Sequence, residues 1–429
     1  MSSSRESQLP QGAMQPSTPS TATSPSSVDD PILAPARTVL RNWTVARYLA
    51  AKEPVSGPPV VLTGDTTIGE ALDRLAEAGI LSAPVMDCSK DALDSAVSWL
   101  GFIDVADVVR SMLRELYPWL LDEPHRSTAP GMMAALAKDG ISLKTVLQDW
   151  AREIFFMRWI RLLRPSADGD LLYKGLGYKS LLEIISFGLA GLPVGAHPGM
   201  QGLVPCHRIA VFDVFNKSNA QQQPFDSDAP TVLRITAVIS QSDICTFLLW
   251  QARQGSLGEL PSRTVASLGW VRDDVVCVPS NMPAIAAFAV MLNRGVSAAG
   301  VTSSLDPGAR LIGSISVSDI RTLREPSDFD AFALPVDEFL SQQYGGVPFP
   351  KTDIMQTLDM DASKPLLWLV SCFPNDSLMK VLDQMVTCGV HRCWIVDQTS
   401  GSPRGVVTCS DILQLLAVDS STDTQRGWL

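Results

Sequence analysis

The stretch GVVTCSDIL at residues 405–413 decides the fold, because three similar stretches precede it in the chain. They read GFIDVADVV at 101–109, AVISQSDIC at 237–245 and GSISVSDIR at 313–321, and the four align without gaps. Each is an apolar strand followed by a short polar residue and then by an aspartate that opens a helix. Recurrence of this kind indicates that one small structural unit is repeated four times.

A second strand precedes each copy, and an amphipathic helix precedes that strand. The strands read ILSAPVMD from residue 80, CHRIAVFDV from 206, GVSAAGVTS from 295 and GVHRCWIVD from 389. The helices are clearest where apolar residues recur three and four positions apart, at Ile68, Ala71, Leu72 and Leu75, and at Leu378, Val381, Leu382 and Met385. The unit is therefore β-α-β-β-α, in the α+β or α/β class. Its roughly 60 residues cannot bury both faces of its helices alone, so we expect repeats to pair.

The repeats predict a division of the chain into seven parts. Residues 1–36 are rich in Ser, Thr and Pro and are expected to form a disordered arm whose deletion leaves the core intact. A plastid transit peptide is an alternative, but the stretch lacks arginine beyond Arg5. The other parts are repeat one at 37–120, a linker at 121–170, repeat two at 171–256, repeat three at 257–330, repeat four with a preceding linker at 331–418, and a tail at 419–429. Repeat two is expected to be the least regular, with loops at 188–202 and 217–230.

The composition is that of a folded, acidic protein. The 429 residues are 46% hydrophobic and carry a net charge of −11. The acidity argues against a nucleic-acid coat, which needs a basic face, so any bound nucleotide must be held by local cations. Eight cysteines without the spacing of a secreted scaffold favour free thiols in a reducing compartment. No apolar run reaches the roughly 18 residues of a membrane span, and we expect a cytoplasmic or nuclear protein.

The repeats resemble the CBS family, and more closely the gamma subunits of the AMP-activated or Snf-type protein kinases. The strongest stretch is GVHRCWIVDQTSGSPRGVVTCSDILQLL at residues 389–416. The resemblance covers about residues 40–418, with a diverged stretch near 115–205. It implies four CBS repeats in two tandem Bateman modules, one with two and three with four, packed head to head in a disk.

The resemblance also implies a ligand and partners. AMP, ADP or ATP would bind in clefts between paired repeats, as a regulatory ligand of a non-catalytic subunit. A catalytic alpha subunit and a beta scaffold subunit would be the partners. The implied nucleotide-binding residues are aspartates, nearby hydroxyls and two His-Arg pairs: Asp107; Ser240, Asp243, His207 and Arg208; Ser316, Ser318 and Asp319; Thr408, Ser410, Asp411, His391 and Arg392.

The same residue types suit a nucleotide on chemical grounds. A carboxylate accepts hydrogen bonds from ribose hydroxyls, and a helix N-terminus offers free N–H groups to phosphate. His and Arg are needed to offset the phosphate charge. The alternative for the aspartates is structural, because Ser240-x-x-Asp243, Ser316-x-x-Asp319 and Thr408-x-x-Asp411 are also helix-capping patterns. Capping and ribose binding can coexist.

Three positions depart from the family pattern. Asp104 occupies the hydroxyl position of the first copy, where it would repel a phosphate and weaken a site at Asp107. Asp243 is present where animal gamma subunits generally lack an aspartate. Gly295 stands where the resemblance implies a cation, for which Arg294 compensates only if the strand shifts.

Other motifs have a simpler interpretation. Cys388, His391 and Cys393, with Cys372 and Cys409 in the same repeat, are too poorly spaced for a structural zinc site, so the cysteines are expected to pack in the core. GLGYKS at 175–180 lacks the glycine of a phosphate-binding loop and is expected to be a turn that opens a helix. The tryptophans in apolar runs are expected to pack in the core, namely Trp250, Trp270, Trp368 and Trp394.

Two functions remain open at this stage. One is the regulatory subunit of an energy-sensing kinase. The other is a free-standing CBS protein that regulates another enzyme through an adenosyl ligand. No kinase, hydrolase or nucleophile–base motif supports an enzyme.

Overall fold

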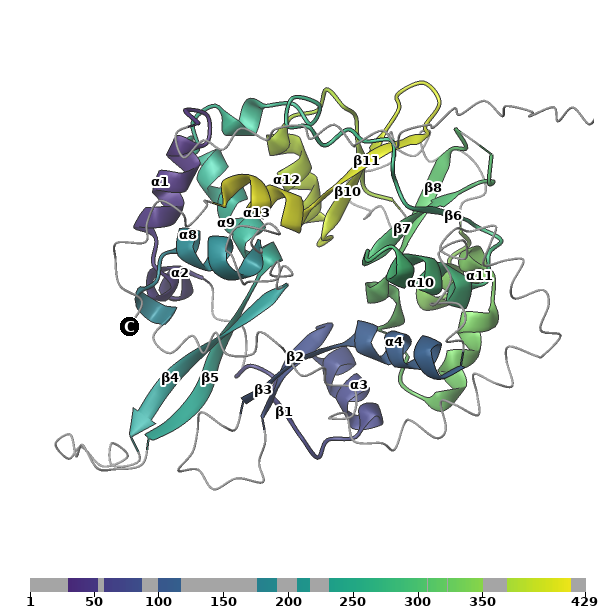
Figure 1. Cartoon of the computed structure of the whole chain (residues 1–429), viewed down its shortest axis with the longest axis horizontal. Helices are drawn as coiled ribbons and strands as arrows, with labels where there is room; N and C mark the ends of the chain where they lie inside the picture. The colour runs from purple at the N-terminus through teal and green to yellow at the C-terminus, as the bar shows by residue number, and fades with distance from the viewer. Residues whose placement is uncertain are drawn as a thin grey trace, which may run out of the picture.

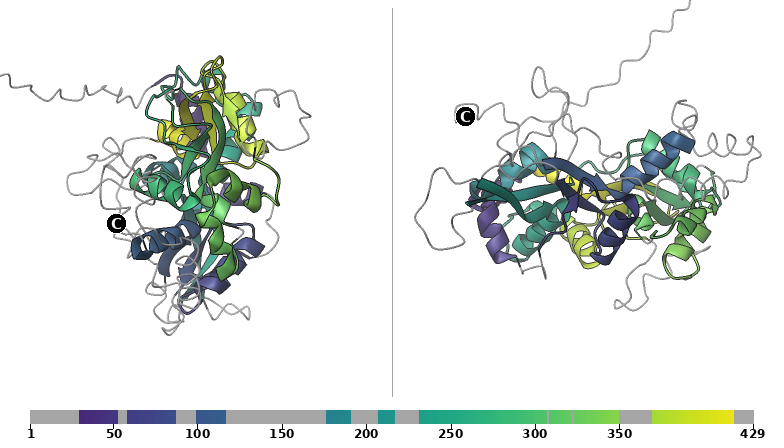
Figure 2. Two further views of the ribbon diagram at one scale, coloured as in Figure 1. Left: turned by 90° about the vertical axis from the view of Figure 1, so that its right-hand side faces the viewer. Right: turned by 90° about the horizontal axis from the view of Figure 1, so that it is seen from below.

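The computed structural model describes residues 30–52, 58–86, 99–116, 176–190, 207–216, 231–306, 308–321, 323–349 and 369–417. Within these ranges four small units surround a common centre, as Figure 1 shows. The perpendicular views in Figure 2 show that the units form one flattened layer. The predicted disk is therefore confirmed.

Repeat four shows the unit in full. Strand β9 pairs in parallel with β10, and β10 pairs antiparallel with β11. Parallel neighbours need a crossover, which the helix α12 provides. The elements are β9 Ser371–Cys372, α12 Leu378–Thr387, β10 Arg392–Val396, β11 Pro403–Thr408 and α13 Cys409–Leu416.

Repeats one and three have the same sheet, with a parallel pair followed by an antiparallel pair. They differ at the last helix, which is a full α-helix in repeat one and a single 3-10 turn in repeat three. The elements of repeat one are β1 Leu62–Thr63, α3 Ile68–Glu77, β2 Ser82–Met86, β3 Trp99–Asp104 and α4 Val105–Leu116. Those of repeat three are β6 Cys277–Pro279, α10 Ala284–Asn293, β7 Ala298–Thr302, β8 Leu311–Ser316 and η8 Val317–Ile320.

Repeat two is the least regular, as predicted. Its sheet has two antiparallel strands in the described ranges. The turn predicted at 175–180 is confirmed, because Ser180 caps α8 through a reciprocal pair of hydrogen bonds with Glu183. The elements are η4 Leu176–Tyr178, α8 Leu181–Ile184, η5 Ile185–Leu189, β4 Arg208–Asn216, β5 Thr231–Ser240 and α9 Gln241–Arg253.

Two large hydrophobic cores hold the disk together. One is shared by repeats one and three and includes α4 and α10. The other is shared by repeats two and four, where α9 packs against α12 and α13. Smaller apolar clusters join the sheets of repeat one to two and of repeat three to four. The two modules are therefore packed head to head, as expected.

Short helices before the repeats also pack into these cores, and they correct one predicted boundary. Leu33 and Ala36 are buried with repeats two and four, so the folded part begins before residue 37. Residues 45–51 likewise pack beside repeat two rather than repeat one. These helices are α1 Ala34–Asn42, α2 Val45–Ala51, η7 Leu260–Ser262, η9 Pro326–Ala333 and α11 Val336–Gln343.

The predictions for tryptophan and cysteine were mostly right. Trp270 and Trp394 are buried, but Trp250 is 46% exposed, so its assignment to the core was wrong. Its ring still contacts those of Trp43 and Phe247. Core packing is confirmed for Cys372, Cys393 and Cys409, which are buried, whereas Cys388 is only half-buried. Trp368, the linker at 121–170, the loop at 217–230, most of the loop at 188–202 and the tail at 419–429 lie outside the described residues. Of the helices in the described ranges, none combines the length and apolarity of a bilayer span.

We expect a protein that lacks residues 1–36 to melt earlier than one that lacks residues 1–29. The longer deletion removes buried Leu33 and Ala36 and the first turn of α1, which should cost about 2 kcal/mol or more. Thermal unfolding followed by circular dichroism compares the two proteins. Equal melting temperatures would contradict the corrected boundary.

Candidate functional site

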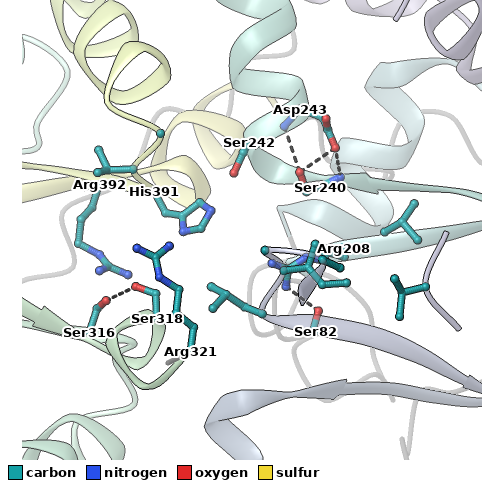
Figure 3. Close-up of a pocket in the computed structure, with 18 of the residues that line it drawn as sticks. Ser82, Arg208, Ser240, Ser242, Asp243, Ser316, Ser318, Arg321, His391 and Arg392 are labelled. Atoms are coloured by element: carbon teal, nitrogen blue, oxygen red, sulfur yellow. Dashed lines mark hydrogen bonds between the residues drawn. The ribbon is translucent and has the colours of Figure 1, made fainter. Parts of the chain in front are cut away.

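A cavity of about 1240 Å³ lies at the centre of the disk and is lined by residues of all four repeats. It is larger than the ~300–1,000 Å³ of most small-molecule sites, so a nucleotide fits. Many of its polar groups come from the strand–helix junctions of repeats two and three and from the first residues of strands β4 and β10. Figure 3 shows these side chains, with Arg321, His391 and Arg392 on one side and Arg208 and Ser82 on the other.

The cavity gathers cations in a protein that is acidic overall. Arg208 begins β4, Arg321 follows η8, and Arg392 begins β10, so three repeats contribute a guanidinium. Arg208 donates to the Ser82 hydroxyl at 2.6 Å, and Arg392 donates to that of Ser297 at 3.1 Å. Within the described ranges Arg321 makes no ion pair. This arrangement leaves positive charge facing the cavity.

His391 lies among these arginines. Enclosure by the protein and then the positive charges of Arg392 and Arg208 lower the pKa of His391 to about 4. The imidazole is therefore neutral at neutral pH in the free protein. An anion between these groups would relieve the crowding of like charge that lowers the pKa.

The signature aspartates cap their helices, so the structural alternative is confirmed. Oδ2 of Asp243 accepts hydrogen bonds from the backbone N–H of Ser240 at 2.8 Å and from its hydroxyl at 2.7 Å. Oδ2 of Asp411 accepts the same pair of bonds from Thr408, at 2.8 and 2.5 Å. Oδ2 of Asp319 accepts from the Ser316 N–H at 2.7 Å. In each case Oδ1 is left for another partner.

Eight of the thirteen predicted site residues line the cavity. They come from repeats two, three and four, and are Arg208, Ser240, Asp243, Ser316, Ser318, Asp319, His391 and Arg392. Burial of Asp319 raises its pKa, whereas its hydrogen bonds and the nearby Arg392 oppose the rise. The two aspartates that reach the cavity thus differ in setting, because Asp319 is buried and Asp243 is half-buried.

The other five predicted residues do not line it. Thr408 and Asp411, which were predicted to bind nucleotide together with His391 and Arg392, do not line this cavity. Thr408 lies opposite Arg392 in the β10–β11 pairing, but its hydroxyl is bonded to Asp411. The remaining three also have other partners: Ser410 donates to Gln241, His207 approaches Gln241, and Asp107 pairs with Arg110.

Asp104 does not act as a free repulsive charge, which corrects that expectation. Its carboxylate lies 3.6 Å from the guanidinium of Arg208 and accepts the N–H of Ala106 at 2.9 Å. Burial raises the pKa of Asp104, and Arg208 is among the groups that oppose the rise. The acid therefore neutralises part of one cavity cation instead of facing a phosphate alone.

Arg321 is the most important cavity residue that sequence reasoning missed. It stands two positions after Asp319, where the other three repeats place the buried residues Val109, Cys245 and Leu413. An arginine at an otherwise apolar position was the available signal. Arg294, considered as the cation of repeat three, is instead exposed at the end of α10 and does not line the cavity.

Three further cavity residues were also missed. Ser242 aligns with Ser318 and Ser410, so the alignment could have found it. Lys52 and Tyr344 lie outside the repeated motif, and no motif points to them.

Comparison with known proteins agrees with the repeated fold. The CBS domain model matches residues 265–325 and 362–418, which correspond to repeats three and four. The regulatory subunit gamma-1 of the SNF1-related protein kinase from Arabidopsis thaliana is 21% identical over 84% of this chain and 79% of its own length. The human 5'-AMP-activated protein kinase subunit gamma-3 is 30% identical over 38% of this chain and 30% of its own length. Protein SDS23 of Kluyveromyces lactis is 26% identical over 43% and 38%, respectively.

A solved structure has a similar extent. The protein MJ1225 from Methanocaldococcus jannaschii is 15% identical and covers 85% of this chain and 98% of its own, with a TM-score of 0.45. Several of the curated relatives extend well beyond the match, because the chain spans half or less of their length. The chain is a CBS-domain protein that resembles the gamma subunits of AMP-activated and SNF1-related protein kinases.

Proposed function

We propose that this chain is a non-catalytic regulatory subunit that binds an adenine nucleotide in the central cavity. The observation that carries the proposal is the set of cations that three repeats contribute to one cavity. Arg208, Arg321 and Arg392 would hold the phosphates, and neutral His391 would add a hydrogen bond. The lining carries four cations, Lys52, Arg208, Arg321 and Arg392, against three carboxylates, Glu77, Asp243 and Asp319, in a protein whose net charge is −11.

The ribose would be held by the aspartates that reach the cavity. Asp243 and Asp319 each use Oδ2 for capping and direct Oδ1 to other side chains. A ribose hydroxyl that donates to Oδ1 would leave the cap intact. Ser240, Ser316 and Ser318 would stand near the phosphates.

Apolar walls on both sides of the cavity suit an adenine ring. Val60, Ile80 and Pro84 line it from repeat one, and Val370 and Trp394 line it from repeat four. A planar aromatic base buries its faces against such side chains. The clefts between repeats one and two and between three and four would thus each offer a wall for adenine beside a carboxylate for ribose.

Regulation of a kinase follows from the relatives rather than from the cavity. The matched proteins from Arabidopsis thaliana and human are named as kinase subunits. We propose that nucleotide occupancy is passed to a catalytic alpha subunit, with a beta scaffold subunit, in the cytoplasm or nucleus. Protein SDS23 is not named as a kinase subunit. A free-standing CBS protein that controls another enzyme through an adenosyl ligand is therefore the second candidate.

We expect affinity purification from a native extract, followed by mass spectrometry, to recover a kinase catalytic subunit with this chain. Reproducible recovery of a different enzyme, without any kinase subunit, would favour the second candidate. Calorimetric titration of the purified protein with AMP tests the ligand separately. Absence of binding at millimolar AMP would overturn the nucleotide proposal.

Arg321→Ala should weaken ADP binding about tenfold or more, because a charge-assisted hydrogen bond to phosphate contributes about 1.5–3 kcal/mol. Adenosine binding should change little, and the loss for ADP should shrink with added salt. Arg294→Ala is the matched control, since Arg294 is an exposed arginine of the same repeat outside the cavity. Equal effects of the two substitutions on ADP affinity would show that Arg321 does not contact the phosphates.

Asp243→Ala and Asp411→Ala separate ribose binding from capping. The two carboxylates make the same capping bonds, so each substitution should lower stability by about 1 kcal/mol. Asp243 alone of the pair lines the cavity, so its loss should also weaken adenosine binding several-fold. Thermal melting and calorimetry on both variants provide the comparison. If Asp243→Ala melts earlier but binds adenosine like the wild type, its role is structural.

A further inference from the structure

Both aspartates that reach the cavity have their outer oxygen, Oδ1, already occupied. The ammonium of Lys52 lies 2.5 Å from Oδ1 of Asp243. The phenol of Tyr344 donates to Oδ1 of Asp319 at 3.1 Å. Oδ1 is the oxygen that capping leaves open, so these two side chains stand where a ribose hydroxyl would donate.

Lys52 and Tyr344 occupy equivalent places in the two modules. Lys52 is the residue that ends α2, the short helix before repeat one, and it reaches repeat two. Tyr344 ends α11, the short helix before repeat four, and it reaches repeat three. An isolated bridge anchors the start of each helix, Thr44 with Ser180 and Pro335 with Pro283. In each module, the residue that ends a short helix before a repeat therefore bonds Oδ1 of one aspartate that lines the cavity.

Asp411 shows that this closure is not a general property of the motif. It has the same capping bonds as Asp243, yet in the described ranges its Oδ1 has no hydrogen-bond partner. Oδ1 of Asp107 forms an ion pair with Arg110, which lies on the same helix. Among the signature aspartates, only the two that line the cavity thus have Oδ1 bonded, in the described ranges, by a residue at the end of a short helix that precedes a repeat.

The two closures differ in charge. Lys52 is a cation on a flexible stem, and both it and Asp243 are partly open to solvent, with side-chain exposures of 28% and 21%. An ion pair so exposed contributes little and can be exchanged. Tyr344 is neutral, and burial raises its pKa further, so it cannot serve as a counter-ion for phosphate. Lys52 also lines the cavity itself.

We propose that Lys52 is a specificity-determining residue, an exchangeable counter-ion that closes the Asp243 cleft in the free protein and transfers to the ligand's phosphate on binding. The inference rests on the proposed nucleotide function and adds a selection rule to it. A nucleoside must break the Lys52–Asp243 pair without replacing it. A nucleotide replaces the pair with two new contacts, because its ribose hydroxyl donates to Asp243 while its phosphate pairs with Lys52. The cleft therefore favours phosphorylated adenosines.

The test is calorimetric titration of Lys52→Met with adenosine and with ADP. Removing the competing cation should strengthen adenosine binding about two- to fivefold, the scale of a partly exposed ion pair. The same change should weaken ADP binding about tenfold, because one charge-assisted contact to phosphate is lost. The two affinities should therefore move in opposite directions.

Three further comparisons make the result specific. Lys52→Arg keeps the cation and should retain the preference of the wild type for ADP. Lys380→Met removes a surface lysine paired with Asp376 at 2.9 Å outside the cavity, and should leave both affinities unchanged. In an Asp243→Asn background Lys52→Met should no longer strengthen adenosine binding, because the closed carboxylate is gone.

The outcomes separate the inference from the function on which it rests. If the wild type binds ADP and Lys52→Met leaves the ratio of ADP to adenosine affinity unchanged, the exchange is refuted and the nucleotide function stands. Affinities that fall together for both ligands also refute the exchange. If neither the wild type nor any variant binds either ligand at millimolar concentration, the nucleotide function is refuted and the exchange with it.

Discussion

Each repeat is too small to cover both faces of its own helices, and the rest of the structure depends on which other repeat covers them. Repeats one and three bury their helices in one shared core, and repeats two and four bury theirs in another. Burial of apolar side chains is the main stabilising term in a fold of this kind. The strand–helix junctions of repeats two and three line the central cavity, and repeat four contributes His391 and Arg392 at the start of β10.

Side chains at these positions supply polar groups to the cavity. A capping aspartate must stand at the start of a helix, beside the hydroxyl that it bonds and the first residues of the neighbouring strand. In repeats two and four these strands begin with Arg208 and Arg392, so helix capping and positive charge are placed together. One local arrangement therefore serves stability through Oδ2 and leaves Oδ1 for other partners. In repeats two and three, Lys52 at the end of α2 and Tyr344 at the end of α11 occupy that oxygen.

Much of the fold could be predicted from the sequence, because the repeated motif fixes strand, cap and helix by short-range patterns. His391 and Arg392, which the sequence singled out as a repeated pair, do line the cavity. What could not be predicted depends on long-range packing. Thr408 and Asp411 match the motif best but do not line the cavity, whereas Lys52 and Tyr344 reach it from helices outside the motif. Arg321 was missed because the single 3-10 turn of repeat three turns a normally buried position toward the cavity.

The central claim is that nucleotide phosphate binds where the cations of three repeats meet. An experimental structure of the protein with ADP bound tests it most directly. The account predicts phosphate oxygens within hydrogen-bond distance of at least two of Arg208, Arg321 and Arg392, with the ribose at Asp243 or Asp319. Density for ADP outside this cavity, or with its phosphates directed away from all three arginines, would contradict the account.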